Sequence, residues 1–183
     1  MHSQFAIKGL VNGQIGYHLI SNHIPEDLDL IKSMQVLQKS CFPETIFDPH
    51  LKIYIRTPLL ENEKDLLPLL EKYGFLIVDP AQISLTEQIS IFGQARVIVA
   101  FQGQGLINVG FCTGGSKTVV LEYLSIRDWN HNPQITFMSK RLGINHLLID
   151  TRANEIDIEE LDCLLDLIVN QHVYNLPINL RLE

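Results

Sequence analysis

Short apolar runs alternate with helix-like patterns along the chain from residue 51 onward. Runs rich in β-branched and other apolar residues are typical of strands that are covered on both faces of a parallel sheet. Such runs predict five strands, over residues 52–56, 75–78, 97–101, 117–123 and 146–149. Apolar residues at helical spacing lie between these runs. We therefore predict an α/β domain with a Rossmann-like, doubly wound and mostly parallel sheet.

Polar residues and glycines mark where several predicted helices begin and end. Asn62 is expected to cap a helix that ends at Gly74, although Pro68 should kink this helix or shift its start. Ser84 and Glu87 have the spacing of a capping box, in which a hydroxyl and a carboxylate satisfy free N–H groups of the first turn. Other helices are expected from about residue 106 to 111, over 134–142 and over 158–169.

The first 50 residues have a different pattern. Glycine and proline interrupt this segment repeatedly, and only residues 26–39 have the spacing of a helix. Residues 1–50 are therefore predicted to be an N-terminal extension packed on the core, and residues 51–183 to form the sheet domain.

Composition and charge narrow the class of protein. The 183 residues are 46% hydrophobic and 19% charged, which is typical of a compact folded protein. The net charge of −7 argues against a surface that coats nucleic acid. No apolar run reaches the ~20 residues of a membrane span. The three cysteines and seven histidines lack metal-ligand spacing, so we expect reduced thiols, no bound metal and a cytoplasmic location.

The strand predicted at 97–101 leads directly into a glycine-containing loop, Gln102-Gly103-Gln104-Gly105. Glycine has no Cβ, so the backbone at Gly103 and Gly105 can turn sharply or approach a ligand closely. A helix that starts near Leu106 would direct free N–H groups at this loop, which suits a phosphate or another anion. The same pattern also fits a plain glycine turn between two buried elements.

The position of a residue along its strand selects further candidates. In doubly wound sheets, ligands bind beyond the carboxyl ends of the strands, near the point where the strand order reverses. Arg96 lies at the start of its strand and so faces the wrong end of the sheet. The carboxyl ends present Arg56, Asp79, residues 102–105, Glu122, Asp150 and Arg152.

These candidates belong to a longer ordered set of residues. The chain contains, in this order, Arg56, Asn62-Glu63, Gly74-Phe75, Glu87-Gln88, Ala95-Arg96-Val97-Ile98-Val99, Gly103-x-Gly105-Leu106-x-Asn108-x-x-Phe111 and Val120-Leu121-Glu122. Over roughly residues 51–149, this set resembles the carboxyl-terminal half of the family 61 glycosyltransferases, a group that includes capsular polysaccharide biosynthesis proteins. The resemblance implies that residues 51–183 form a Rossmann-like nucleotide-sugar-binding domain, one half of the two-domain GT-B architecture.

The resemblance also implies a donor site. By it, Arg56 and the glycine loop lie near the donor's diphosphate, and Glu122 belongs to the donor pocket. Arg56 would grip the diphosphate as a fork and stabilise the departing nucleotide. Glu122 would bond ribose hydroxyls or cap the following turn, and Asn108 would contact the donor or brace the loop backbone. The expected donor-binding residues are Arg56, Gln102, Gly103, Gln104, Gly105, Leu106, Asn108 and Glu122.

Two departures from the family pattern bear on activity. The family usually has His-Gly-Ala-Gly at the loop, whereas this chain has Gln102 and Gln104. Histidine can donate a proton to a leaving phosphate, but glutamine can only hydrogen-bond to it, and the long side chain of Gln104 would stand where a small residue lets the ligand approach. Fifty residues before the first strand are also too few to build an acceptor domain.

Three functions therefore remain open. The first is inverting transfer from a nucleotide sugar to a hydroxyl acceptor, without metal or cofactor, in which a homodimer or a partner subunit completes the acceptor site. The second is a non-catalytic binding or assembly module. The third is a nucleotide-binding enzyme such as an epimerase, but Asn108 stands where a dinucleotide fingerprint has Gly or Ala, and the loop follows the third predicted strand instead of the first. No residue is assigned as the catalytic base.

Overall fold

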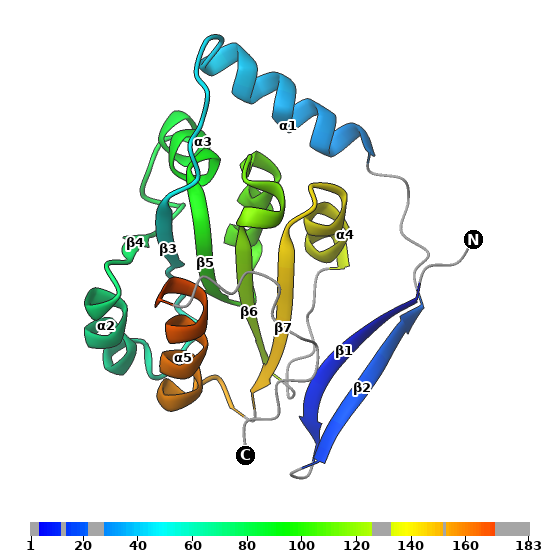
Figure 1. The fold of residues 1–183 in the computed structure, drawn as a ribbon, viewed down its shortest axis with the longest axis vertical. Coiled ribbons are helices and arrows are strands. Elements are labelled where there is room, and N and C mark those ends of the chain that lie inside the picture. The colour runs from blue at the N-terminus through cyan, green and yellow to red at the C-terminus, as the bar shows by residue number, and fades with distance from the viewer. Residues whose placement is uncertain (1–3, 12–13, 22–27, 126–132, 152, 171–183) are drawn as a thin grey trace.

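The computed structural model describes residues 4–11, 14–21, 28–125, 133–151 and 153–170. Seven strands and five α-helices are described in these ranges, together with short 3₁₀ and π-helical segments. In chain order the elements are β1 (Gln4–Val11), β2 (Gln14–Ser21), α1 (Leu28–Cys41), β3 (Leu51–Ile55), α2 (Glu63–Lys72), β4 (Leu76–Val78), α3 (Leu85–Gly93), β5 (Ala95–Phe101), η1 (Gln104–Phe111), η2 (Gly115–Lys117), β6 (Val119–Ser125), α4 (Pro133–Arg141), β7 (Asn145–Thr151), α5 (Ile158–Leu165) and η3 (Asp166–Asn170), as Figure 1 shows.

Strands β3 to β7 form a single sheet in the order β4-β3-β5-β6-β7. All of its neighbouring strands are parallel, which confirms the predicted α/β fold and makes the sheet fully instead of mostly parallel. Each of the five predicted strands is present with small shifts at its ends. After β4 the chain crosses back over β3 to form β5, so the strand order reverses between β3 and β5.

Helices cover both faces of this sheet, as a doubly wound fold requires (Figure 1). One core cluster joins α1, α3, η1 and α4 to one face of the sheet, and a second cluster joins α2 and α5 to the other face. Successive residues of a strand point to opposite faces, so Ile98 of β5 enters the first cluster and Val99 enters the second. Burial on both faces is the reason why β5 reads as a continuous apolar run.

The predicted N-terminal caps of α3 and α2 differ in their hydrogen bonds. Ser84 and Glu87 form the expected capping box, with Glu87 N–H donating to Ser84 Oγ at 3.3 Å and Ser84 N–H donating to Glu87 Oε2 at 2.8 Å. Asn62 does precede α2, but its side chain caps nothing there. It instead accepts from the N–H of Ile156 at 3.1 Å and donates to the carbonyl of Ile156 at 2.8 Å, which ties α2 to the segment before α5. Helix α2 continues through the exposed Pro68.

The N-terminal segment contains a hairpin that the apolar pattern did not predict. Strands β1 and β2 pair antiparallel, with Val11 opposite Gln14, and β1 lies beside β7 (Figure 1). The signal that was overlooked is Asn12-Gly13, a two-residue turn pair between two strand-like runs.

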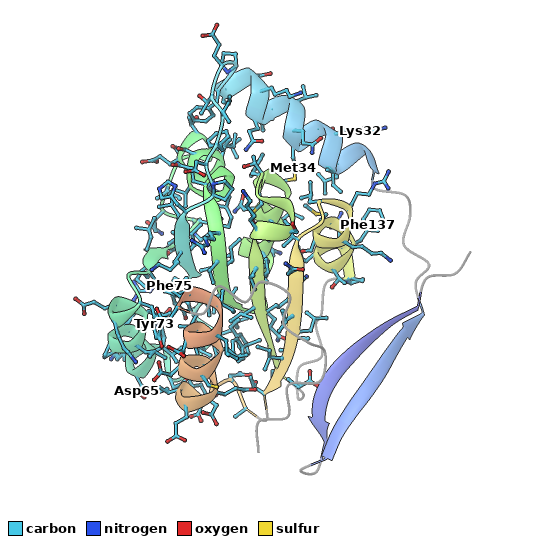
Figure 2. The ribbon with its side chains drawn as sticks, viewed as in Figure 1. Lys32, Met34, Asp65, Tyr73, Phe75 and Phe137 are labelled. Carbon is cyan, nitrogen blue, oxygen red and sulfur yellow. The ribbon has the colours of Figure 1, made fainter. Side chains whose placement is uncertain are left out.

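Helix α1 matches the predicted helix closely. Its residues Ile31 and Met34 are buried in the first core cluster, and Figure 2 shows Met34 on the inner side of the helix and Lys32 on the outer side. The division of the chain at residue 50 stays a prediction. No helix in the described ranges is long and apolar enough to cross a membrane.

Candidate functional site

The carboxyl ends of β3 and β5 lie side by side at the point where the strand order reverses. Ile55 at the end of β3 is in register with Ala100 of β5, so Arg56 and Gln102 follow their strands at nearly the same level. The connections leave toward opposite faces, since α2 packs on one face and η1 on the other. Open α/β sheets bind ligands at such a switch point. The fold therefore brings Arg56 and the glycine loop to neighbouring positions.

The side chain of Arg56 is held on one side by an acidic residue. Its Nε donates to Glu63 Oε2 at 3.0 Å, and Tyr54 Oη donates to Glu63 Oε1 at 3.2 Å. Tyr54 is fully buried, and burial together with the charge of Glu63 raises the pKa of its phenol, so it remains a proton donor. The Arg56 side chain is 48% exposed. We find no bond from its two terminal nitrogens to a described residue.

The two glycines of the loop have different surroundings. A Cβ at Gly105 would lie 2.8 Å from Ile55 Cγ2 and 3.3 Å from Pro80 Cγ, so the absence of a side chain lets the loop pack against the end of β3. A Cβ at Gly103 would meet nothing closer than the Phe101 carbonyl at 3.8 Å. The backbone at Gly103 is extended, a conformation that any residue adopts. Packing therefore explains Gly105, whereas a Cβ at Gly103 would make only an ordinary contact.

Asn108 braces the glycine loop through side-chain hydrogen bonds. Its Nδ2 donates to the Gly105 carbonyl at 3.2 Å and to Gln88 Oε1 at 2.9 Å. Gln88 in turn donates to the carbonyls of Pro80 and Ile83, at 2.8 and 3.2 Å, so the bracing reaches the connection between β4 and α3. Of the two roles open for Asn108 in the sequence, the structure displays the bracing contacts. Apart from its place in the ordered family set, nothing in the sequence singles out Gln88.

The remaining loop residues face different environments. Gln102 is 6% exposed, and its Oε1 accepts from the N–H of Ser125 at 3.2 Å, which links the ends of β5 and β6. Gln104 is exposed, and Leu106 is buried in the first core cluster. The helix that follows is a 3₁₀-helix from Gln104, not a helix from near residue 106, and the N–H of Leu106 bonds back to the Gly103 carbonyl at 3.4 Å.

Glu122 lies inside β6 instead of at its end. The strand continues to Ser125, and Glu122 is 1% exposed. Its Oε2 is 2.9 Å from Nε2 of His146, at the start of β7, without the alignment of a hydrogen bond. In this arrangement Glu122 and His146 form a buried acid–histidine pair, which no sequence signal indicated. The place of Glu122 in a donor pocket stays a prediction.

Asp79 follows β4, the strand next to β3, and the N–H of Arg56 donates to the carbonyl of Val78 at 2.8 Å. Asp79 Oδ1 accepts from the N–H of Ala81 at 3.0 Å and so shapes the turn after β4. Arg96 lies at the amino end of β5, as expected. Arg152 falls outside the described residues.

A family comparison covers the ordered set of residues quoted above as far as Leu121. The model of the family described as Glycosyltransferase 61 matches residues 22–121, which is more than half of the chain. The chain belongs to glycosyltransferase family 61. The matched part of this family 61 domain runs from just before α1 into β6, so it includes Arg56, Glu63, the glycine loop and Asn108. The comparison with curated proteins finds no match.

Proposed function

We propose that this family 61 domain binds the diphosphate of a nucleotide-sugar donor at the switch point between β3 and β5. The observation that carries the proposal is the half-exposed guanidinium of Arg56, held through Nε at the carboxyl edge of the sheet. An arginine with free terminal nitrogens matches two phosphate oxygens as a bidentate fork. The charge and the geometry of the group therefore suit a diphosphate.

The glycine loop supplies a second argument for the same site. Neither packing nor backbone conformation accounts for glycine at position 103, since a Cβ there would make only an ordinary contact and the backbone is extended. Close approach of a ligand to the backbone is the remaining reason for a residue without a Cβ. Gly103 and Gln104 are exposed, and their backbone N–H groups would then donate to phosphate oxygens.

The reaction proposed for this site is inverting transfer. An acceptor hydroxyl oxygen forms a bond to the anomeric carbon from the face opposite the nucleotide, while the bond from that carbon to the diphosphate oxygen breaks. The proton of the acceptor passes to a base, and the nucleoside diphosphate leaves with the bonding electron pair. Arg56 would stabilise the negative charge that grows on the leaving group. The identity of the base is not assigned to any described residue.

A panel of nucleotides tests the donor site. We expect one of UDP, GDP and dTDP, or the matching nucleotide sugar, to raise the melting temperature. Ligand at a hundredfold excess over its Kd stabilises the folded state by ~2.7 kcal/mol, which corresponds to roughly 5–10 °C for a domain of this size. Arg56→Ala should abolish this shift, whereas Arg96→Ala, at the opposite end of the sheet, should keep it. A panel that gives no shift would refute the proposal.

A second function, a non-catalytic binding or assembly module, is favoured by one observation. The side chain of Gln102 is buried and engaged with the backbone of Ser125, and an amide does not titrate, so this position supplies neither an acid nor a base. The two functions differ in turnover. An enzyme would release nucleoside diphosphate from the donor that stabilises it in the panel, in the presence of sugar acceptors. A module would bind that donor and leave it intact.

A further inference from the structure

We infer that Glu63 is a positioning residue for the diphosphate, acting through Arg56. The inference rests on the proposed function, because it concerns how the donor's phosphates are gripped. It starts from the three-residue group Tyr54–Glu63–Arg56, in which both oxygens of a single carboxylate are engaged.

Anchoring to the core distinguishes this ion pair from an ordinary surface pair. Exposed pairs contribute little, since two long side chains lose freedom to meet in water. Here Glu63 is the first residue of α2, its side chain is only 17% exposed, and the hydroxyl of the fully buried Tyr54 holds its Oε1. Tyr54 lies on β3 and packs on the face that α2 covers, and Arg56, just past the end of β3, reaches the same carboxylate at the start of α2. The acceptor for Nε is therefore fixed before any ligand arrives.

The use of Nε determines what the rest of the guanidinium can do. A carboxylate bonded to Nε restrains the plane of the group and leaves the two terminal nitrogens along its outer edge. A pre-oriented fork loses less conformational freedom when it binds phosphate than a mobile one does. Glu63 thus converts a half-exposed, flexible arginine into an oriented one. Lysine could not replace Arg56 in this group, because an ammonium has no fixed plane.

The experiment compares Kd values by calorimetry, using the nucleoside diphosphate that stabilises the wild-type protein and the corresponding nucleoside without phosphates. Glu63→Ala should weaken binding of the diphosphate about tenfold, the scale of one side chain that must be ordered on binding. Glu63→Gln should stay within about threefold of wild type, because its amide oxygen still accepts from Arg56 Nε and its NH₂ group can donate to Tyr54 Oη. Glu61→Ala removes the same charge two residues before α2 begins and should change nothing.

Each result decides the inference. A selective loss of diphosphate affinity in Glu63→Ala, with nucleoside affinity unchanged and with recovery in Glu63→Gln, supports it. Equal losses for diphosphate and nucleoside would show a general structural role and overturn it. Unchanged or tighter diphosphate binding by Glu63→Ala would also overturn it. Glu63 would then have no effect on binding, or would compete with the diphosphate for Arg56. If the wild-type protein binds no nucleotide, the proposed function itself fails, which is a distinct result.

Discussion

The contrast between Gly105 and Gly103 gives the sharpest test of the loop geometry. A Cβ at Gly105 would lie 2.8 Å from Ile55 Cγ2, closer than real Cβ contacts allow. That methyl group cannot move aside easily, because Ile55 is 3% exposed and its β-branched side chain is stiff at χ1. Gly105→Ala must therefore push the loop away from the end of β3 or distort the core beside it.

The size of the effect follows from two opposing contributions. Overpacking of this kind costs about 1–3 kcal/mol of unfolding free energy. Replacing glycine by alanine restores about 0.4–1 kcal/mol by restricting the unfolded chain. We therefore expect Gly105→Ala to lose about 1–2 kcal/mol, which lowers the melting temperature by roughly 2–8 °C in a chain of this length. Gly103→Ala has no such contact and should keep or slightly raise the stability.

Urea unfolding followed by circular dichroism measures this difference, with the m-value checked for a two-state change. The same two variants also separate packing from ligand binding. Gly103→Ala should weaken nucleotide binding while leaving stability intact, because its methyl group would enter the open space beside the loop. The reasoning is refuted if Gly105→Ala is as stable as wild type, or if Gly103→Ala loses as much stability as Gly105→Ala.

Two further predictions concern hydrogen bonds outside the arginine group. Asn108→Ala should lower the unfolding free energy by about 1–3 kcal/mol, because Gln88 Oε1 and the Gly105 carbonyl lose their donor. In a double-mutant cycle with Gln88→Ala, the two losses should be non-additive. Hydrogen bonds from Tyr73, and to a lesser extent from Lys72, lower the pKa of the Asp162 carboxyl. The ionised carboxyl therefore stabilises the folded state at pH values above its unfolded pKa of about 3.9. This contribution is lost as the pH falls through the lower pKa of the folded state. Tyr73→Phe should raise the pKa of Asp162, as measured by NMR titration, and should make the unfolding free energy fall less steeply at acidic pH. An unchanged pKa of Asp162 would contradict this.

Much of the fold was predictable because it depends on neighbours in sequence. The capping box of Ser84 and Glu87 closes within one helical turn, and the apolar run of β5 records burial on both faces of a sheet. The hairpin β1–β2 was missed although its turn signal, Asn12-Gly13, is equally local. That error came from reading glycine only as a breaker, since a two-residue turn uses glycine to join strands.

The candidate site was predictable in position but not in its contacts. Strand ends and the switch-point rule predict Arg56 and the glycine loop at one edge of the sheet. The role of each glycine needed the structure, because Gly105 is explained by Ile55 and Pro80, both far from it in sequence, while a side chain at Gly103 would meet no other side chain.

The sequence by itself determined the order of strands and helices from residue 51 onward, the capping box at Ser84 and the end of the sheet that carries Arg56, because these follow from hydrophobic periodicity and turn chemistry over a few residues. Only the tertiary structure decided the partner of each polar side chain. Asn62 bonds to a backbone 94 residues away, and Glu122 lies against a histidine of the next strand. Such contacts form when parallel strands and their crossover helices pack together, and no local pattern in the chain encodes which polar atoms that packing will bring within bonding distance.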